Sequence, residues 1–560
     1  MKKVTFGTPE EFVPSMFCRD FRPVETGVRY DEGRIGFRVN ARGCVLTLPL
    51  EAEEQIYGFG LQITCFNHKN KKLTLRPNAD PVKPTGDAHA PAPFFVSTGG
   101  YGIFFDTLRD AEFYCGVPDA ATWIPGKQGE ETYIPKVIGG DSVMKVQIPA
   151  AKGVTLYIFE GNTITDVVSE YNRMAGGGPL VPDWGLGPFY RCYMRYTQEE
   201  VLGMAEYFRK AEIPCDILGL EPGWQTRAYS CSYVWNPERF PDPEGMIRKL
   251  REMGYHVNLW EHAFTHPESP LAEEVKKGCG ETVCWGGYVP DFALPEIRSA
   301  FAKYHREHVM YGAVDGFKLD ECDGSDYTGS WSVPNCDRFP SGLDGEQYHS
   351  LFGTLYMQAM LEALEGQETL SEVRSAGALG ASYPFVLYSD LYAHRDFIRA
   401  CANSGFAGLL WAPELRHAES RKDLIRRLQT AVFSVQCLIN AWYCQKAPWL
   451  DLGCEGEVRE LLKLRKSLVP MLHKAFQQYH ETGKAPVRAL VSDFTNDPET
   501  WNIDDEYIFC DMIVAPLTAE SDTRRVYLPE GEWVDFFTGT PASSGWSEYT
   551  GDGIPVYRRA

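Results

Sequence analysis

Acidic side chains follow several short apolar runs in the middle of the chain, at the point where each run stops. In the clearest case, the run 316–319 is followed at once by Asp320. A single Asp after a strand is more often a helix cap than a catalytic group. Here, however, acids recur after most of the runs, at Glu221, Glu261, Asp320, Glu321, Asp323, Asp390 and Glu414. The recurrence predicts a pocket lined with carboxylates.

Such a pocket could cleave a glycosidic bond, because that chemistry needs two carboxyl groups. One stabilises or attacks the anomeric centre, and the other protonates the leaving oxygen. Asp320 and Asp390 are the candidates for this pair. Aromatic faces stack on sugar rings, and tryptophans occur near the same acids, although most aromatic residues will be core: Trp224, Trp260, Trp285, Trp411 and Trp442.

The elements that must position these acids alternate between strand and helix from about Trp184 onward. Eight apolar runs predict strands at 187–190, 215–220, 257–260, 316–319, 369–373, 384–388, 407–411 and 437–440. Amphipathic stretches predict helices between them, for example at 198–211, 244–253, 296–311 and 421–434. Eight such units favour a (β/α)8 TIM barrel over a doubly wound sheet. In a barrel the chemistry lies at the carboxyl ends of the strands, so Asp320 and Asp390 could face each other across one mouth.

Two β-rich regions flank the predicted barrel. Strand patterns at 43–48, 93–97 and 102–106, separated by Gly, Pro and Asn, predict an antiparallel β-sandwich. A predicted helix at 164–174 ends in three glycines, and another at 455–482 leads into a β-rich tail. We therefore expect an α/β protein with an N-terminal sandwich at 1–180, a catalytic barrel at 181–482 and a small C-terminal β-domain at 483–560.

Ordered sequence strings connect these regions to a known family. They are Tyr-Gly-Phe-Gly at 57–60, Pro-Asp-Trp-Gly-Leu-Gly at 182–187, Trp-Asn-Pro-Glu-Arg-Phe-Pro-Asp-Pro at 235–243, Asp-Gly-Phe-Lys-Leu-Asp at 315–320 and Asp-Met-Ile-Val-Ala-Pro at 511–516. In these strings and their order, the chain resembles glycoside hydrolase family 31 over nearly its whole length. The resemblance implies a retaining, exo-acting α-glycosidase of the α-glucoside or α-xyloside class, with no cofactor and no metal.

The resemblance also implies roles for individual residues. Asp320 matches the nucleophile and Asp390 the acid/base, which must begin neutral. We expect the negative charge of Asp320 to raise the pKa of Asp390 in that direction. Arg374 matches the arginine that holds sugar hydroxyls, and Lys318 resembles a lysine of the branch with bacterial α-xylosidases. The remaining substrate contacts that we predict are Glu221, Trp260, Trp285, Trp411, Glu414 and Asn440.

Three positions depart from the family pattern and leave the sugar open. Glu221 stands where the family usually has Asp, Leu387 where it has Trp, and Asn440 where it has His. An α-galactosidase or an α-N-acetylgalactosaminidase with the same mechanism is therefore an alternative. An alternative of another class is a catalytically degenerate barrel that binds carbohydrate without cleaving it, but the two catalytic acids argue against it.

Composition limits the partners further. The formal net charge of −21 argues against nucleic acid and anionic membranes, and no apolar run is long enough to span a bilayer. The first residues lack the apolar stretch of a secretory signal, and 16 scattered cysteines fit free thiols in a reducing cytoplasm. His262 and His266 lack a third metal ligand. We expect a cytoplasmic protein with a small carbohydrate substrate; whether it forms a homo-oligomer stays open.

Overall fold

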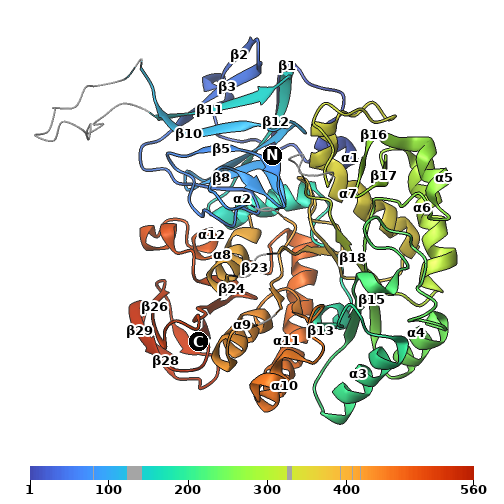
Figure 1. The fold of residues 1–560 in the computed structure, drawn as a ribbon. Helices are drawn as coiled ribbons and strands as arrows, with labels where there is room; N and C mark the ends of the chain where they lie inside the picture. Colours follow the sequence, from blue (N-terminus) through green and yellow to red (C-terminus); the bar gives the residue numbers. More distant parts are fainter. Residues whose placement is uncertain are drawn as a thin grey trace, which may run out of the picture.

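Three parts make up the molecule in the computed structural model, which describes residues 1–79, 81–120, 122, 142–324, 331–390, 393–406, 408–416 and 418–560. An N-terminal β-sandwich lies at the top of Figure 1, a barrel occupies the centre and right, and a C-terminal β-domain lies at the lower left. This order confirms the predicted fold class.

Two antiparallel five-stranded sheets build the N-terminal sandwich. One has the order β1-β12-β9-β8-β4 and the other β2-β3-β11-β10-β5. Phe59, Phe95 and Phe113, which come from both sheets, are fully buried in one apolar cluster. The strands are β1 (Lys2–Thr8), β2 (Gly36–Asn40), β3 (Gly43–Leu50), β4 (Ile56–Gly60), β5 (Lys72–Thr74), β8 (Pro91–Ser97), β9 (Tyr101–Asp106), β10 (Glu112–Pro118), β11 (Ser142–Pro149) and β12 (Lys152–Glu160).

Eight parallel strands form the barrel in the order β20-β19-β18-β15-β14-β13-β22-β21. A parallel bridge connects Leu387, the last residue of β20, to Trp411, which shortly precedes β21. The two ends of the sheet are thus brought together. The strands are β13 (Pro188–Arg191), β14 (Ile217–Leu220), β15 (His256–His262), β18 (Gly316–Asp320), β19 (Ser371–Val373), β20 (Phe385–Leu387), β21 (Glu414–Leu415) and β22 (Cys437–Asn440).

Alternation along the strands sorts barrel side chains into inward and outward sets. Phe189, Ile217 and Leu438 form a small buried cluster near the amino-terminal ends of their strands. Two residues further along β13 and β22, the inward positions are polar, at Arg191 and Asn440, and the matching position of β14 is Gly219. The apolar cluster therefore lies at the barrel floor, and the side chains of Arg191 and Asn440 lie nearer the mouth.

Helices cover most of the barrel's outer face (Figure 1). They are α3 (Gln198–Lys210), α4 (Pro243–Glu252), α6 (Pro295–His305), α7 (Gly345–Leu364), α8 (His394–Ser404), α9 (Arg421–Val432) and α11 (Glu455–Thr482). The predicted helices at 198–211, 244–253 and 421–434 are confirmed within two residues at each end. Most of the residues in α7 are buried, so it lacks the polar stripe that makes a helix easy to predict.

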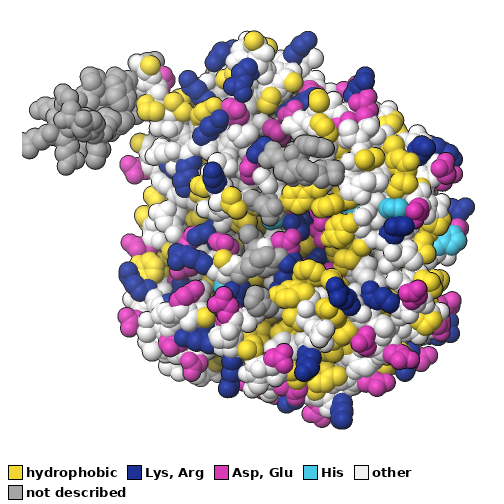
Figure 2. Space-filling model, viewed as in Figure 1, with side chains coloured by type: hydrophobic (Ala, Val, Ile, Leu, Met, Phe, Trp, Pro, Cys, Tyr) yellow, Lys and Arg dark blue, Asp and Glu magenta, His cyan; other side chains and the backbone are white. Residues whose placement is uncertain are grey.

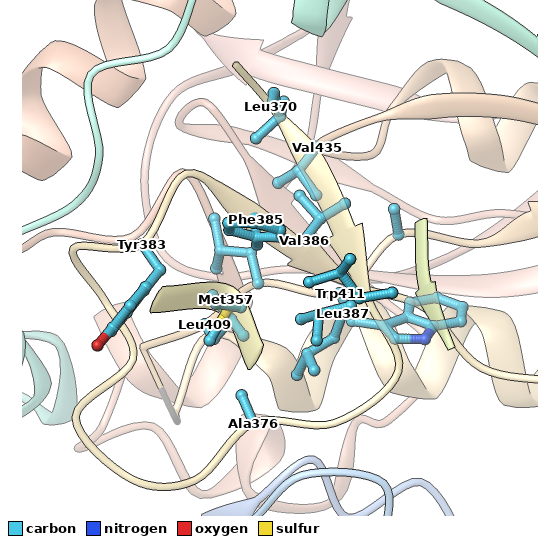
Figure 3. Close-up of a cluster of buried hydrophobic side chains, with 14 of the residues drawn as sticks. Met357, Leu370, Ala376, Tyr383, Phe385, Val386, Leu387, Leu409, Trp411 and Val435 are labelled. Atoms are coloured by element: carbon cyan, nitrogen blue, oxygen red, sulfur yellow. The ribbon is translucent and has the colours of Figure 1, made fainter. Parts of the chain in front are cut away.

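The seventh predicted strand is misplaced. Residue 407 lies outside the described residues and 408–410 form no strand; Trp411 makes only an isolated bridge to Leu387, and β21 begins at Glu414. Trp411 instead packs its indole beside Leu387 within a buried apolar cluster (Figure 3). An apolar run of five residues cannot by itself distinguish a barrel strand from a buried loop.

A six-stranded sheet of order β23-β24-β25-β30-β27-β28 and the separate pair β26-β29 form the C-terminal domain. The strands are β23 (Val487–Ala489), β24 (Tyr507–Phe509), β25 (Met512–Val514), β26 (Thr523–Leu528), β27 (Trp533–Asp535), β28 (Pro541–Ala542), β29 (Gly545–Thr550) and β30 (Val556–Arg559). Helix α2 (Ile164–Met174) precedes the barrel, and α11 ends at a left-handed Gly483. We propose domain boundaries after residues 180 and 482 on these grounds.

Within the described residues, no helix is long and apolar enough to cross a bilayer. All 16 cysteines are unpaired, and most of them are buried.

Candidate active site

Asp320 ends strand β18 and is only 8% exposed. Its Oδ2 accepts a hydrogen bond from Trp260 Nε1 at 2.7 Å, and its Oδ1 accepts one from the backbone N–H of Glu321 at 2.9 Å. Burial alone would raise the pKa of Asp320, but the cations of Arg374 and Lys318 hold it below the ordinary value. The carboxylate is therefore ionised at neutral pH, as a nucleophile must be.

Arg374, directly after strand β19, connects three carboxylates. Its Nε donates to Asp323 Oδ2 at 2.8 Å. Its Nη1 lies 3.2 Å from Asp320 Oδ1 and 2.6 Å from Asp390 Oδ2. Because one nitrogen contacts both oxygens, Asp320 and Asp390 approach within about 6 Å of each other, close to the roughly 5–5.5 Å between carboxyl groups in retaining glycosidases.

Asp390 is held as an anion by two arginines. Besides Arg374, the guanidinium of Arg416 forms an ion pair with its Oδ1. Burial would raise the pKa of Asp390, but the two guanidiniums outweigh burial and lower it well below the ordinary value. The expectation of a raised pKa for Asp390 is therefore wrong for the free protein. The guanidiniums of Arg374 and Arg416 contact this carboxylate directly, and their effect exceeds that of the Asp320 anion. Arg416 could have been noticed, since it stands two residues after Glu414 on the same side of the strand.

Lys318 and Glu414 form a buried ion pair beneath these groups. Lys318 Nζ donates to Glu414 Oε1 at 2.6 Å, and Asn440 Nδ2 donates to Oε2 at 3.1 Å. Burial would lower the pKa of Lys318, but Glu414 raises it above the ordinary value, so Lys318 is a cation. Burial raises the pKa of Glu414 to about 7, against the opposing effect of Lys318. Lys318, Glu414 and Asn440 were all predicted to contact the substrate. Each is less than 3% exposed, so these side chains support the mouth from below.

A second buried network surrounds Arg191, a residue that sequence reasoning missed. Its Nη1 donates to Glu221 Oε1 at 3.1 Å and its Nη2 to Asn258 Oδ1 at 2.5 Å, while Nη2 also pairs with Glu372. Gly219 leaves room for this side chain, since a Cβ there would lie 2.7 Å from Arg191 Cγ. Glu221, predicted to contact sugar, is thus fixed by a cation from β13.

We expect Arg191→Met to lower the free energy of unfolding by about 3–5 kcal/mol, because Glu221 and Glu372 would stay buried without their cation. The midpoint of urea unfolding, followed by tryptophan fluorescence, measures this loss. Arg248→Met is the matched control, since Arg248 pairs with the exposed Glu244 and its side chain is 66% exposed. Equal midpoints for the two variants would contradict the account.

Aromatic side chains build one wall beside Asp320. The ring of Tyr229 lies 5.5 Å from Trp260, 5.4 Å from His262 and 5.2 Å from Trp285. Trp285 in turn contacts Trp331 edge to face. The indole N–H of Trp285 is buried without a hydrogen-bond partner in the described part of the chain, so it can serve a ligand. Trp260 and Trp285 thus both pack against Tyr229, and Trp260 also contacts Asp320. Tyr229 was not among the predicted residues.

Two predicted residues lie away from this wall. Trp411 is 1% exposed, and its Nε1 donates to Ser389 Oγ at 3.1 Å, so it contacts the residue that precedes Asp390. Glu261 points outward from β15, where its carboxylate accepts hydrogen bonds from Tyr356 at 2.8 Å and lies 3.0 Å from His305 Nε2. The prediction that Glu261 lines the mouth is wrong, because it has the opposite parity to its neighbour Trp260.

The N-terminal sandwich also reaches the site. His89 lies two residues before strand β8, and its Nδ1 is 2.8 Å from Asp323 Oδ2; both residues are 1% exposed. Asp323 thus connects His89 to Arg374. No local pattern marks His89, because its partner is more than two hundred residues away.

The middle of the face shown in Figure 2 brings acidic, basic and hydrophobic side chains together. Within the described residues, no group of three or more His, Cys, Asp or Glu side chains could hold a metal ion.

Three family models match the chain. The model of the glycosyl hydrolase family 31 TIM-barrel domain matches residues 178–475, that of the family's C-terminal domain residues 483–560, and that of its galactose mutarotase-like N-terminal domain residues 28–113. The models fall on the three parts described above and in the same order.

Curated relatives match most of this chain at low sequence identity. An α-glucosidase of Bacillus thermoamyloliquefaciens is 24% identical over 92% of this chain and 67% of its own length. An α-xylosidase of Lactiplantibacillus pentosus is 24% identical over 89% of this chain and 66% of its own length. The chain thus spans about two thirds of the length of these relatives.

Solved structures show the same fold. A dextranase of Flavobacterium johnsoniae in complex with glucose superimposes with a TM-score of 0.78 at 22% identity, covering 94% of this chain and 67% of the other. An α-xylosidase from a soil metagenome in complex with xylose gives 0.77 at 21% identity, covering 94% and 81%.

Proposed function

The chain belongs to glycoside hydrolase family 31, and from that premise we propose that it is a retaining, exo-acting α-glycosidase. The observation that carries the proposal is the bridging of Asp320 and Asp390 by one nitrogen of Arg374. This bridging keeps the two contacted carboxylate oxygens within about 6 Å of each other, close to the roughly 5–5.5 Å of double-displacement enzymes. The names of the relatives favour an α-glucoside or α-xyloside as substrate.

The proposed reaction has two steps. Asp320 attacks the anomeric carbon while protonated Asp390 gives its proton to the leaving oxygen, which breaks the glycosidic bond. The Asp390 carboxylate then takes a proton from water, and this water cleaves the β-linked ester on Asp320 with net retention. Trp260 contributes by holding Oδ2 of the Asp320 carboxylate in place.

Asp390 can act as an acid only when its ion pair with Arg416 opens. We expect Arg416→Met to raise the pKa of Asp390, because one of two neighbouring cations is removed. The proposed acid is active when protonated, so the fall of kcat/KM on the alkaline side should move to higher pH by about one unit. The pH profile of kcat/KM measures this shift.

Arg421→Met serves as the control for this shift, since Arg421 pairs with the exposed Glu457 and its own side chain is 60% exposed. Its profile should follow the wild type. An alkaline fall that stays in place in Arg416→Met, or moves to lower pH, would contradict the role given to Asp390.

A panel of p-nitrophenyl α-glycosides tests the proposed function. We expect release of p-nitrophenol from the α-glucoside or the α-xyloside, and proton NMR should show the α-anomer as first product. Activity confined to an α-galactoside or an N-acetyl-α-galactosaminide would keep the mechanism and change the sugar. Silence on every glycoside, combined with sugar binding in calorimetry, would favour a binding-only barrel.

We also propose a cytoplasmic location and a small carbohydrate as the substrate, with no nucleic acid or membrane as a partner. The unpaired state of all 16 cysteines supports a reducing compartment. Light scattering after size exclusion decides whether the protein is a monomer or a homo-oligomer.

A further inference from the structure

Tyr388 directly follows strand β20 and lies in the same row of the barrel as Asp320 and Arg374. Strands β18, β19 and β20 pair in parallel up to the residue that precedes each of these three. The backbone N–H of Arg374 donates to a carbonyl of β18 at 2.9 Å, and that of Tyr388 donates to a carbonyl of β19 at 3.2 Å. Side chains at one level of neighbouring parallel strands point to the same face of the sheet, so Tyr388 is directed into the mouth with the other two.

Two cations contact the ring of Tyr388 in this position. Lys318 Nζ lies 4.3 Å from the centroid of the ring, and the guanidinium carbon of Arg374 lies 5.8 Å from it. These are the two cations that hold the pKa of Asp320 below its ordinary value. The aromatic ring attracts both of them, which fixes Tyr388 beside the charged groups of the site.

The hydroxyl group of Tyr388 is a buried donor that the protein does not use. The residue is 1% exposed, and within the described ranges its Oη has no hydrogen-bond partner. Burial, followed by the negative charge of Asp320, raises the pKa of Tyr388 well above its ordinary value, so the group keeps its proton. An unpaired buried donor is costly, and native proteins contain few of them. A ligand that accepts a hydrogen bond from this hydroxyl would remove the cost.

The carboxylate of Asp320 cannot be that acceptor during the proposed reaction, because none of its acceptor sites is left over. A carboxylate offers about four lone-pair sites. Trp260 Nε1, the N–H of Glu321 and Arg374 Nη1 occupy three of them, and the fourth is needed for attack on the anomeric carbon. Asp320 is itself only 8% exposed, so a sugar whose anomeric carbon reaches it must enter the layer that contains Tyr388.

We propose that Tyr388 is a specificity-determining residue whose hydroxyl donates a hydrogen bond to a hydroxyl of the sugar that lies against Asp320. The proposal rests on the α-glycosidase function proposed above and deepens it. A site built to bond a substrate hydroxyl rejects the analogue that lacks it, because the buried group of the protein is then left unpaired. Tyr388 thereby selects the sugars that carry this hydroxyl.

The substitution Tyr388→Phe removes one oxygen atom and keeps the ring that contacts the two cations. We expect kcat/KM on p-nitrophenyl α-D-glucopyranoside or α-D-xylopyranoside, whichever the wild type cleaves better, to fall roughly tenfold or more, because the sugar hydroxyl loses its donor. The melting temperature should stay equal or rise, because the free protein loses only an unpaired polar group. A loss of activity without a loss of stability distinguishes a contact with the substrate from a structural role.

Tyr190 provides a matched control in the same barrel. It is also 1% exposed, and its Oη likewise has no hydrogen-bond partner in the part of the chain that the structure describes. It points outward from β13, where its ring packs against Phe208 of helix α3 at 5.1 Å. Tyr190→Phe should therefore show the same melting behaviour as Tyr388→Phe and leave kcat/KM unchanged.

Monodeoxy p-nitrophenyl glycosides identify the hydroxyl of the sugar. The analogue that lacks it should react more slowly with the wild type, and Tyr388→Phe should cause no further loss on this analogue. On every other analogue the variant should lose the same factor as on the parent glycoside. An equal loss on all analogues would mean that Tyr388 acts through Asp320 rather than through the sugar, and would overturn the proposal.

Two further outcomes would also overturn it. Wild-type kcat/KM in Tyr388→Phe would mean that the hydroxyl makes no productive contact. If the wild type cleaves no glycoside, the function proposed above has failed, and calorimetric titration with methyl α-D-glucopyranoside and methyl α-D-xylopyranoside then tests the contact by itself. Tyr388→Phe should weaken this binding roughly tenfold; an equal Kd, or a wild type that binds neither sugar, would overturn the contact.

Discussion

Replacing Asp320 by Asn is expected to lower kcat by about 10⁴-fold or more, because the substrate loses the carboxylate that attacks its anomeric carbon. Asn has nearly the same shape, and its single oxygen can still accept from one of the two donors, Trp260 Nε1 or the N–H of Glu321. Arg374 retains Asp323 and Asp390 as partners. The variant should therefore fold and bind sugar while losing turnover on every glycoside that the wild type cleaves.

The measurement is steady-state kinetics with the best p-nitrophenyl α-glycoside, together with mass spectrometry of the protein after a slow 5-fluoro glycosyl fluoride. The wild type should gain the mass of one glycosyl group on the peptide that contains Asp320, and the variant should gain none. Asp183→Asn is the control, since this side chain is 72% exposed before the first barrel strand. Label on a different peptide would give the nucleophile's role to another residue.

Much of this site was predictable because barrel chemistry follows a simple geometric rule. Strands that end in acids share one mouth, so Asp320 and Asp390 could be paired without coordinates. The same rule, applied residue by residue, could have placed Glu261 correctly, since it alternates with Trp260 on β15. The rule also predicts an inward side chain for Arg191, which lies two residues after the inward Phe189 on β13.

The rest depends on contacts between distant segments, which no local pattern records. His89 reaches Asp323 from the N-terminal sandwich, and Arg416 reaches Asp390 from another strand. These contacts decide the charge state of the site. The carboxylates alone predict only repulsion between Asp320 and Asp390, and this repulsion gives the wrong direction for the pKa of Asp390. The left-handed turn at Glu321 could not be predicted either, because glycine usually marks such a backbone and none stands there.

Replacing Asp390 by Asn should impair substrates in proportion to how much their leaving group needs a proton. For a methyl or disaccharide α-glycoside we expect kcat/KM to fall about 10²–10⁴-fold, the usual contribution of a general acid. For a 2,4-dinitrophenyl glycoside or a glycosyl fluoride, whose leaving groups depart without a proton, glycosylation of Asp320 should be nearly unaffected. Hydrolysis of the ester would then limit turnover, because no carboxylate activates water.

Azide makes this prediction specific to Asp390. As an anion that needs no general base, it should restore turnover of the activated substrates and yield the α-glycosyl azide, the configuration that attack on a β-linked ester requires. The two guanidiniums that bind Asp390 in the free protein should help to hold the anion there. Asp423→Asn, which affects a residue paired with Arg427 in helix α9, should show no azide effect. An equal loss on all leaving groups, without rescue, would instead give Asp390 a structural role and assign the acid to another residue.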